Sequence, residues 1–68
     1  MFEELKEFID ECYERAKKYV KTYRDVENYR AQAFGALTFA MDNKLVTYEE
    51  TEGYWNEMWD KFQNLAYR

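Results

Sequence analysis

Proline is absent from this 68-residue sequence, and glycine occurs only at positions 35 and 53. Proline breaks helices, and glycine supplies the backbone angles that most tight hairpin turns require. With so little of either residue, long helices are unopposed and strands lack the turns that would connect them. We therefore expect an all-α fold.

Histidine and serine are also absent, and Cys12 is the single cysteine. Neither a Ser-His-Asp triad nor a Cys-His pair can be built without histidine. One cysteine cannot form a disulfide within the chain, and one cysteine without histidine cannot form an ordinary zinc site. We expect no catalytic residues, no cofactor and no metal, and therefore no enzyme.

No stretch of the sequence approaches the roughly 20 consecutive apolar residues that span a bilayer. The chain begins Met1-Phe2-Glu3-Glu4, which is acidic where a secretory signal would be basic. Hydrophobic residues make up 47% of the chain and charged residues 35%, a composition typical of a soluble globular protein. We expect a cytoplasmic protein that does not bind a membrane.

The length allows one helical domain over residues 1–68. A domain of this size buries only about 60% of the surface that its unfolded chain exposes, so its core is marginal. Small domains usually compensate with disulfides, a metal or another subunit. Because the first two are excluded, the sequence predicts a homodimer.

Apolar residues recur at alternating steps of three and four from Phe2 to Val26, and less strictly to residue 41. This heptad repeat is typical of a helix that packs along one face. We call its first part the N-terminal seam, which consists of Phe2, Leu5, Ile9, Cys12, Ala16, Tyr19 and Tyr23.

A break follows at Asp42-Asn43-Lys44, where we expect Asn43 to adopt the left-handed conformation that ends many helices. Thr47 and Glu50 then have the spacing of a capping box, in which each side chain accepts from the other residue's amide. The sequence therefore predicts a last helix over about residues 47–66.

Two architectures fit these patterns. In the first, a helix over about residues 2–41, about 60 Å long at 1.5 Å per residue, packs against an antiparallel helix over 47–66, and this hairpin dimerises. In the second, a break near residues 22–25, capped by Asp25, gives a compact three-helix bundle. We favour the first, because a turn at 22–25 would contain no glycine, proline or asparagine.

The last helix carries an aromatic face made of Trp55, Trp59 and Phe62. Aromatic residues at helical spacing in a small chain usually form its core. Two indoles one turn apart cannot both occupy the centre of a narrow seam, so we expect Trp59 at the edge, where an indole is a typical binding hot spot. Gly35 is expected to allow close approach of a bulky ring such as Trp55.

Charge is segregated along the chain, whose net charge is −4. Residues 1–14 carry six acids and one lysine, residues 15–24 carry five bases and no acid, and the remaining residues carry eight acids and four bases. An antiparallel dimer centred near Tyr13 would place acidic segments beside basic ones. An acidic chain of this kind is not expected to bind nucleic acid.

These features predict a small non-enzymatic helical protein–protein interaction module that self-associates through the N-terminal seam. A line of carboxylates at helical spacing supports a different function, because it can imitate a phosphate backbone. The chain would then be an acidic inhibitor that blocks a nucleic-acid-binding protein, as some short phage proteins do. This decoy face consists of Glu3, Glu7, Asp10 and Glu14.

Overall fold

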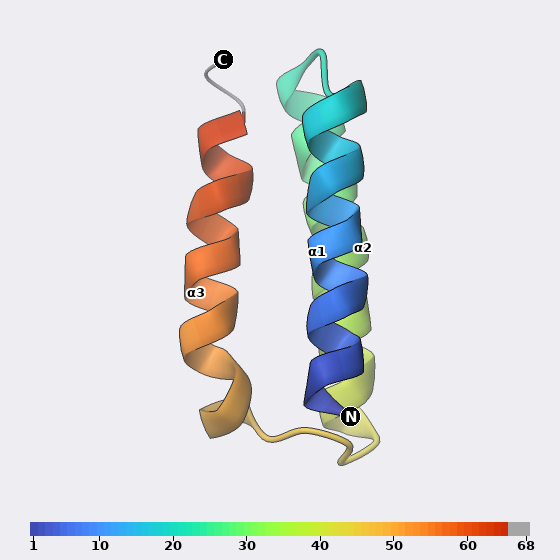
Figure 1. Cartoon of the computed structure of the whole chain (residues 1–68), viewed down its shortest axis with the longest axis vertical. Helices are drawn as coiled ribbons and strands as arrows, with labels where there is room; N and C mark the ends of the chain where they lie inside the picture. The colour runs from blue at the N-terminus through green and yellow to red at the C-terminus, as the bar shows by residue number, and fades with distance from the viewer. Residues whose placement is uncertain (66–68) are drawn as a thin grey trace.

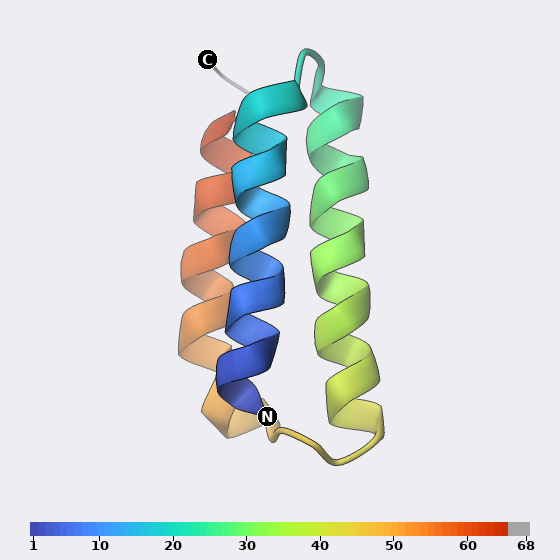
Figure 2. The ribbon, with the colours of Figure 1, turned by 45° about the vertical axis from the view of Figure 1, so that its right-hand side comes forward.

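The computed structural model describes residues 1–65 and consists of three helices, α1 (Phe2–Tyr19), α2 (Tyr23–Asp42) and α3 (Tyr48–Leu65). The helices run up, down and up beside one another (Figure 1), and the view in Figure 2 separates α1 from α2. Residues 1–65 contain no strand, so the all-α class predicted from the sequence is confirmed. Ala66, the expected last residue of the final helix, lies outside the described residues.

The prediction of one continuous helix over residues 2–41 is wrong, and the alternative with a break near residues 22–25 is the observed fold. The longest dimension of the bundle is 35 Å, whereas a 40-residue helix would be about 60 Å long. Helix α1 ends at Tyr19, and Val20 takes an extended conformation with φ −68° and ψ 129°. The chain then reverses and starts α2 at Tyr23.

A capping box starts α2 and explains why the helix breaks here. The Asp25 amide donates to Thr22 Oγ1 at 3.3 Å, and the Thr22 amide donates to Asp25 Oδ2 at 3.1 Å. The Lys21 amide donates to the same carboxylate oxygen at 3.0 Å. Thr22 is therefore the cap, and Asp25 lies in the first turn rather than at the cap position that the sequence suggested.

The second turn contains the capping box predicted at Thr47. The Glu50 amide donates to Thr47 Oγ1 at 3.1 Å, and the Thr47 amide donates to a Glu50 carboxylate oxygen at 3.4 Å. The expected left-handed residue is displaced by one position, because Lys44 has φ 59° while Asn43 has φ −92°. The Asn43 side chain instead donates to the Phe39 carbonyl at 2.9 Å.

The core lies along the bundle axis and takes residues from all three helices and from the second turn. Its buried apolar members are Leu5, Ile9, Cys12, Ala16, Val26, Ala33, Leu37, Ala40, Val46, Met58, Phe62 and Leu65.

Four members of the N-terminal seam, Leu5, Ile9, Cys12 and Ala16, are thus buried inside the chain. Phe2 packs against the core as a partly buried residue. Tyr19 is 58% exposed and Tyr23 46% exposed, because the repeat loses its common face where the helix breaks. A second copy cannot reach the middle of this seam unless the bundle opens.

Helices α1 and α2 approach each other along more of their length than either approaches α3. Alanines at the core positions 16, 33 and 40 permit this, since the distance between two helix axes depends on the side chains at their contact. Bulkier side chains fill the space beside α3, for example Tyr13 and Phe62, whose rings meet edge to face at 5.5 Å.

None of the three helices has the length and apolar character needed to cross a membrane.

Candidate protein-binding groove between α2 and α3

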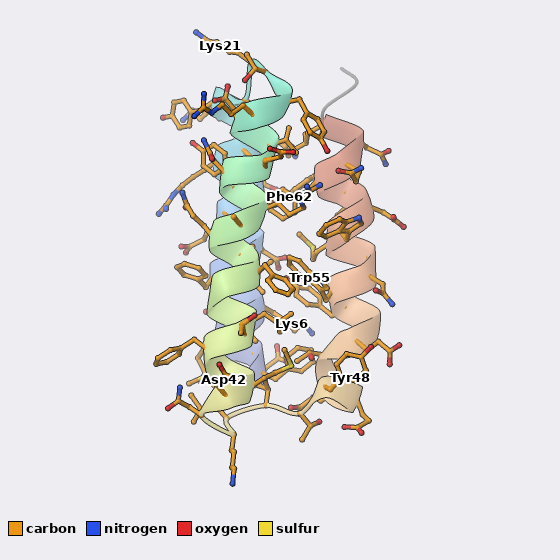
Figure 3. The ribbon with its side chains drawn as sticks, turned by 180° about the vertical axis from the view of Figure 1, so that it is seen from behind. Lys6, Lys21, Asp42, Tyr48, Trp55 and Phe62 are labelled. Atoms are coloured by element: carbon orange, nitrogen blue, oxygen red, sulfur yellow. The ribbon has the colours of Figure 1, made fainter. Side chains whose placement is uncertain are left out.

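A groove follows the junction of α2 and α3. Figure 3 shows Trp55 between these two helices. It contains two hollows that meet at Phe34. The larger hollow, about 440 Å³, is lined by Glu27, Arg30, Ala31, Phe34 and Trp59. The smaller hollow, about 130 Å³, is lined by Phe34, Leu37, Met41, Tyr48, Thr51, Glu52, Trp55 and Asn56. We call the two hollows together the aromatic groove.

Three rings form a continuous aromatic surface along the groove. Phe34 of α2 lies 5.5 Å from Trp55 of α3 between ring centroids, and Trp55 lies 6.2 Å from Trp59 with the rings tilted by 66°. Trp55 is partly buried against the core, while Phe34 is 45% exposed and Trp59 is 40% exposed. Trp55 is thus the floor of the groove, and the other two rings are its accessible walls.

Arg30 holds the Trp59 wall in place. Its guanidinium carbon lies 4.0 Å from the centroid of the Trp59 ring, within the range of a cation–π contact. The Arg30 guanidinium also donates a hydrogen bond to the Gln63 side-chain oxygen. Because a planar guanidinium both stacks and donates in fixed directions, these contacts restrict the indole before any partner arrives.

The rim of the groove is polar and carries a carboxylate near each end. Glu27 borders the larger hollow, and Glu52 borders the smaller one together with Asn56. All three side chains are exposed. An apolar floor within a polar rim is the usual anatomy of a protein–protein interface.

Sequence reasoning identified part of this groove and missed the rest. It placed Trp59 at the edge of the core, where the structure also places it. Phe62, by contrast, is fully buried and contributes no surface. Phe34 was missed because it lies one position off the apolar repeat, and Arg30 because it interrupts that repeat. An off-register aromatic residue one turn after an arginine at an apolar position of the repeat was the available signal.

The expectation for Gly35 is wrong. Gly35 is exposed, and a Cβ atom added there would meet no other atom within 4 Å. The aromatic ring that approaches Trp55 comes from the neighbouring residue, Phe34, on the adjacent side of the helix.

Comparison of the chain with protein-family models, curated proteins and solved structures found no match.

The four residues of the decoy face are exposed on α1, outside the aromatic groove. Three of them are engaged within the chain. Glu3 pairs with Lys6 at 3.6 Å and Glu14 with Lys17 at 3.4 Å. Asp10 accepts a 2.7 Å hydrogen bond from the Tyr54 hydroxyl, so it joins α1 to α3.

The thiol of Cys12 lies in the core, and burial raises its pKa. A buried protonated thiol is a poor nucleophile and a poor metal ligand. Within residues 1–65, no three histidine, cysteine, aspartate or glutamate side chains are close enough together to hold a metal ion.

Proposed function

We propose that this chain is a small non-enzymatic protein–protein interaction module, and that a partner protein binds in the aromatic groove. The observation that carries the proposal is the continuous Phe34–Trp55–Trp59 surface, in which two large rings remain exposed beside a hollow of about 440 Å³. Tryptophan and arginine are the residue types most enriched at binding hot spots, and both line this hollow.

A purely structural role accounts poorly for the exposed part of the groove. Within residues 1–65, twelve apolar residues already form the core, and neither Phe34 nor Trp59 belongs to it. Exposed apolar surface with a polar rim is a liability for a free protein and usually marks a binding site. The Arg30 contacts also favour binding, because a wall that is already fixed loses less entropy when a partner docks.

The test is capture of partner proteins from an extract of the source cells by the immobilised chain. The wild type is compared with Phe34→Glu and Trp59→Ala, which change the groove without removing a core residue. Phe39→Glu is the matched control, because Phe39 is 66% exposed on the same helix but does not line the groove.

We expect the groove variants to lose the proteins that the wild type and Phe39→Glu retain, with equal helicity in circular dichroism for all four. Proteins that bind all four chains equally, or binding lost only in Phe39→Glu, would place the interaction elsewhere.

The acidic decoy is a second candidate function, supported by the exposure of all four decoy-face carboxylates on one helix. It is the weaker candidate, because contacts within the chain already occupy three of these four groups. A decoy should release its target steeply as salt rises, and Glu7→Lys should abolish its binding while Phe34→Glu should not. If a partner binds in the aromatic groove instead, Phe34→Glu should abolish binding, Glu7→Lys should not, and added salt should have little effect.

A further inference from the structure

We infer that the occupant of the aromatic groove is a second copy of this chain, docked antiparallel about a two-fold axis. This inference rests on the proposed function and names the partner. Sequence reasoning pointed to self-association through α1, whose seam is buried in the core. The α2–α3 face, in contrast, leaves its aromatic side chains accessible to another molecule.

The two ends of the bundle carry opposite charge, and this sets the orientation. In Figure 3, Lys21 marks one end, while Asp42 and Tyr48 mark the other. The α1–α2 turn and the helix segments beside it, residues 15–27, carry five bases against the two acids Asp25 and Glu27, and the bases are Arg15, Lys17, Lys18, Lys21 and Arg24. The opposite end, residues 1–6 and 42–52, carries six acids against the two bases Lys6 and Lys44, and the acids are Glu3, Glu4, Asp42, Glu49, Glu50 and Glu52.

A parallel pair of chains would put like charge beside like charge at both ends. An antiparallel pair puts the basic end of each chain beside the acidic end of the other. Under two-fold symmetry each favourable pair occurs twice, because the same surface is used by both copies. Exposed pairs are individually weak, so charge selects the orientation while burial of the rings supplies the attraction.

Two cations lie near the ends of the groove, although neither lines a hollow. Arg24 lies one turn before Glu27 on α2, and Lys44 lies in the turn between α2 and α3, at the Glu52 end of the bundle. Inverting a second copy brings its Arg24 toward Glu52 and its Lys44 toward Glu27. The same inversion brings Glu27 of one copy toward Glu52 of the other, so Arg24 and Lys44 are the cations that would flank this pair of carboxylates.

The rings are placed suitably for a two-fold axis. Phe34 lies near the middle of α2 and Trp55 near the middle of α3, so an axis through the middle of the groove makes the two Phe34 rings neighbours. The same operation carries the exposed Tyr48 ring of each copy toward the larger hollow of the other.

One face of the bundle supplies enough area. A stable interface buries about 800 Å² on each partner. The accessible surface of the chain is 4861 Å², so such an interface needs about one sixth of it. A bundle of three helices has three lateral faces, and the α2–α3 face is one of them.

Sedimentation velocity of the purified chain between about 5 and 500 µM tests whether it pairs and through which face. We expect the wild type to approach twice its mass of 8.4 kDa as concentration rises. Phe34→Glu should weaken self-association at least tenfold, and the matched control Phe39→Glu should not. Circular dichroism of each variant establishes that it is folded.

Charge exchange tests the orientation. Arg24→Glu and Glu52→Arg should each weaken self-association severalfold at low salt, since each places like charges together twice. An equimolar mixture of the two variants should pair as tightly as the wild type, because both sets of contacts then join opposite charges. Glu7→Arg, on the outer face of α1, is the control and should change nothing in the mixture.

A chain that stays monomeric at 500 µM overturns the inference, as does pairing that survives Phe34→Glu and is lost in Phe39→Glu. Charge variants that do not restore each other overturn the antiparallel orientation. A monomeric chain that nevertheless captures another protein in a Phe34-dependent manner overturns only the second copy as occupant and leaves the proposed function standing. Pairing that depends on Phe34 and is restored in the mixed charge variants supports the inference in full.

Discussion

Trp55 and Trp59 lie one helical turn apart, yet they contact different parts of the molecule. Trp55 packs against the core and Phe34, whereas Trp59 stacks under Arg30 and remains 40% exposed. Trp55→Ala should therefore cost about 3 kcal/mol of unfolding free energy, and Trp59→Ala about 1 kcal/mol. Urea denaturation measures both values.

Fluorescence quenching provides the independent check on the two indoles. In the Trp59→Phe variant, the remaining Trp55 should be quenched less by acrylamide than the remaining Trp59 in Trp55→Phe. The reverse order would mean that Trp59 is the buried floor of the groove and Trp55 its exposed wall.

Gly35 has no structural need to be glycine. Its Cβ position is open, and no glycine in the described chain has a positive φ. Glycine inside a helix costs roughly 0.5 to 1 kcal/mol relative to alanine, mainly through the entropy of the unfolded chain. Gly35→Ala should therefore raise the unfolding free energy by that amount in a thermal or urea melt. A loss of stability would indicate a close contact at this position.

At the residue scale, sequence patterns located local features well and exposure less well. The Thr47–Glu50 capping box could be read directly, because its two hydrogen bonds involve residues three positions apart. The left-handed residue was predicted one position too early, because asparagine favours that conformation but the Asn43 side chain here donates to the Phe39 carbonyl, and the positive φ falls on Lys44. The exposure of Phe34 depends on which face α3 covers, and no pattern within one helix contains that information.

The turn between α1 and α2 is made without any special residue. Val20 has φ −68° and Thr22 has φ −135°, which are ordinary angles for any side chain. The absence of glycine, proline and asparagine therefore gave no reason to reject a turn at this point. The Thr-x-x-Asp spacing of Thr22 and Asp25 was the local signal, and the continuing apolar repeat concealed it.

If Thr22 starts α2, its side chain should matter as much as that of Thr47, which starts α3. Each N-cap hydroxyl oxygen accepts a hydrogen bond from one backbone amide that has no partner within the helix. Thr22→Ala and Thr47→Ala should each cost about 1 kcal/mol, while Gln32→Ala in the exposed middle of α2 should be nearly neutral. A neutral Thr22→Ala would show that the helix break has another cause.

The turn between α1 and α2 makes the stability of the fold depend on pH in the acidic range. The hydrogen bond from the Lys21 amide, assisted by those from Thr22, holds the pKa of Asp25 below its ordinary value of 3.8. A lowered folded-state pKa stabilises the protein above the unfolded-state pKa, and this contribution is lost as the pH falls through the folded-state value. Between wild type and Asp25→Asn, the difference in melting temperature should be constant near pH 7 and shrink below about pH 3.8. A difference that grows in acid would contradict this assignment.

At the scale of the whole molecule, the choice between two long helices and three short ones is a tertiary one. Leu5, Ile9, Cys12 and Ala16 could satisfy their apolar repeat equally well against a second chain or against their own α2 and α3. The heptad pattern specifies a face, and it does not specify which helix covers that face. This is why the sequence predicted the all-α class and the seam but not the chain reversal.

The reactivity of the Cys12 thiol tests whether α1 packs within its own chain. Its side chain is 1% exposed, and burial raises the pKa of its thiol. In the three-helix bundle it should react with a thiol reagent at least a hundredfold more slowly than in urea, and no disulfide-linked dimer should form in air. Rapid labelling of the folded protein would mean that α1 leaves the bundle and exposes its seam.

The central claim is that the aromatic groove of this chain pairs with the groove of a second copy, and a concentration series of nitrogen–proton correlation spectra tests it most directly. Between about 20 µM and 1 mM, we predict shifts in the Trp55 and Trp59 indole signals and the Phe34 amide. The amides of Glu3, Glu7 and Glu11 on the outer face of α1 should stay unchanged. Spectra in which the groove signals are unchanged, or in which the shifts follow α1, would contradict the account.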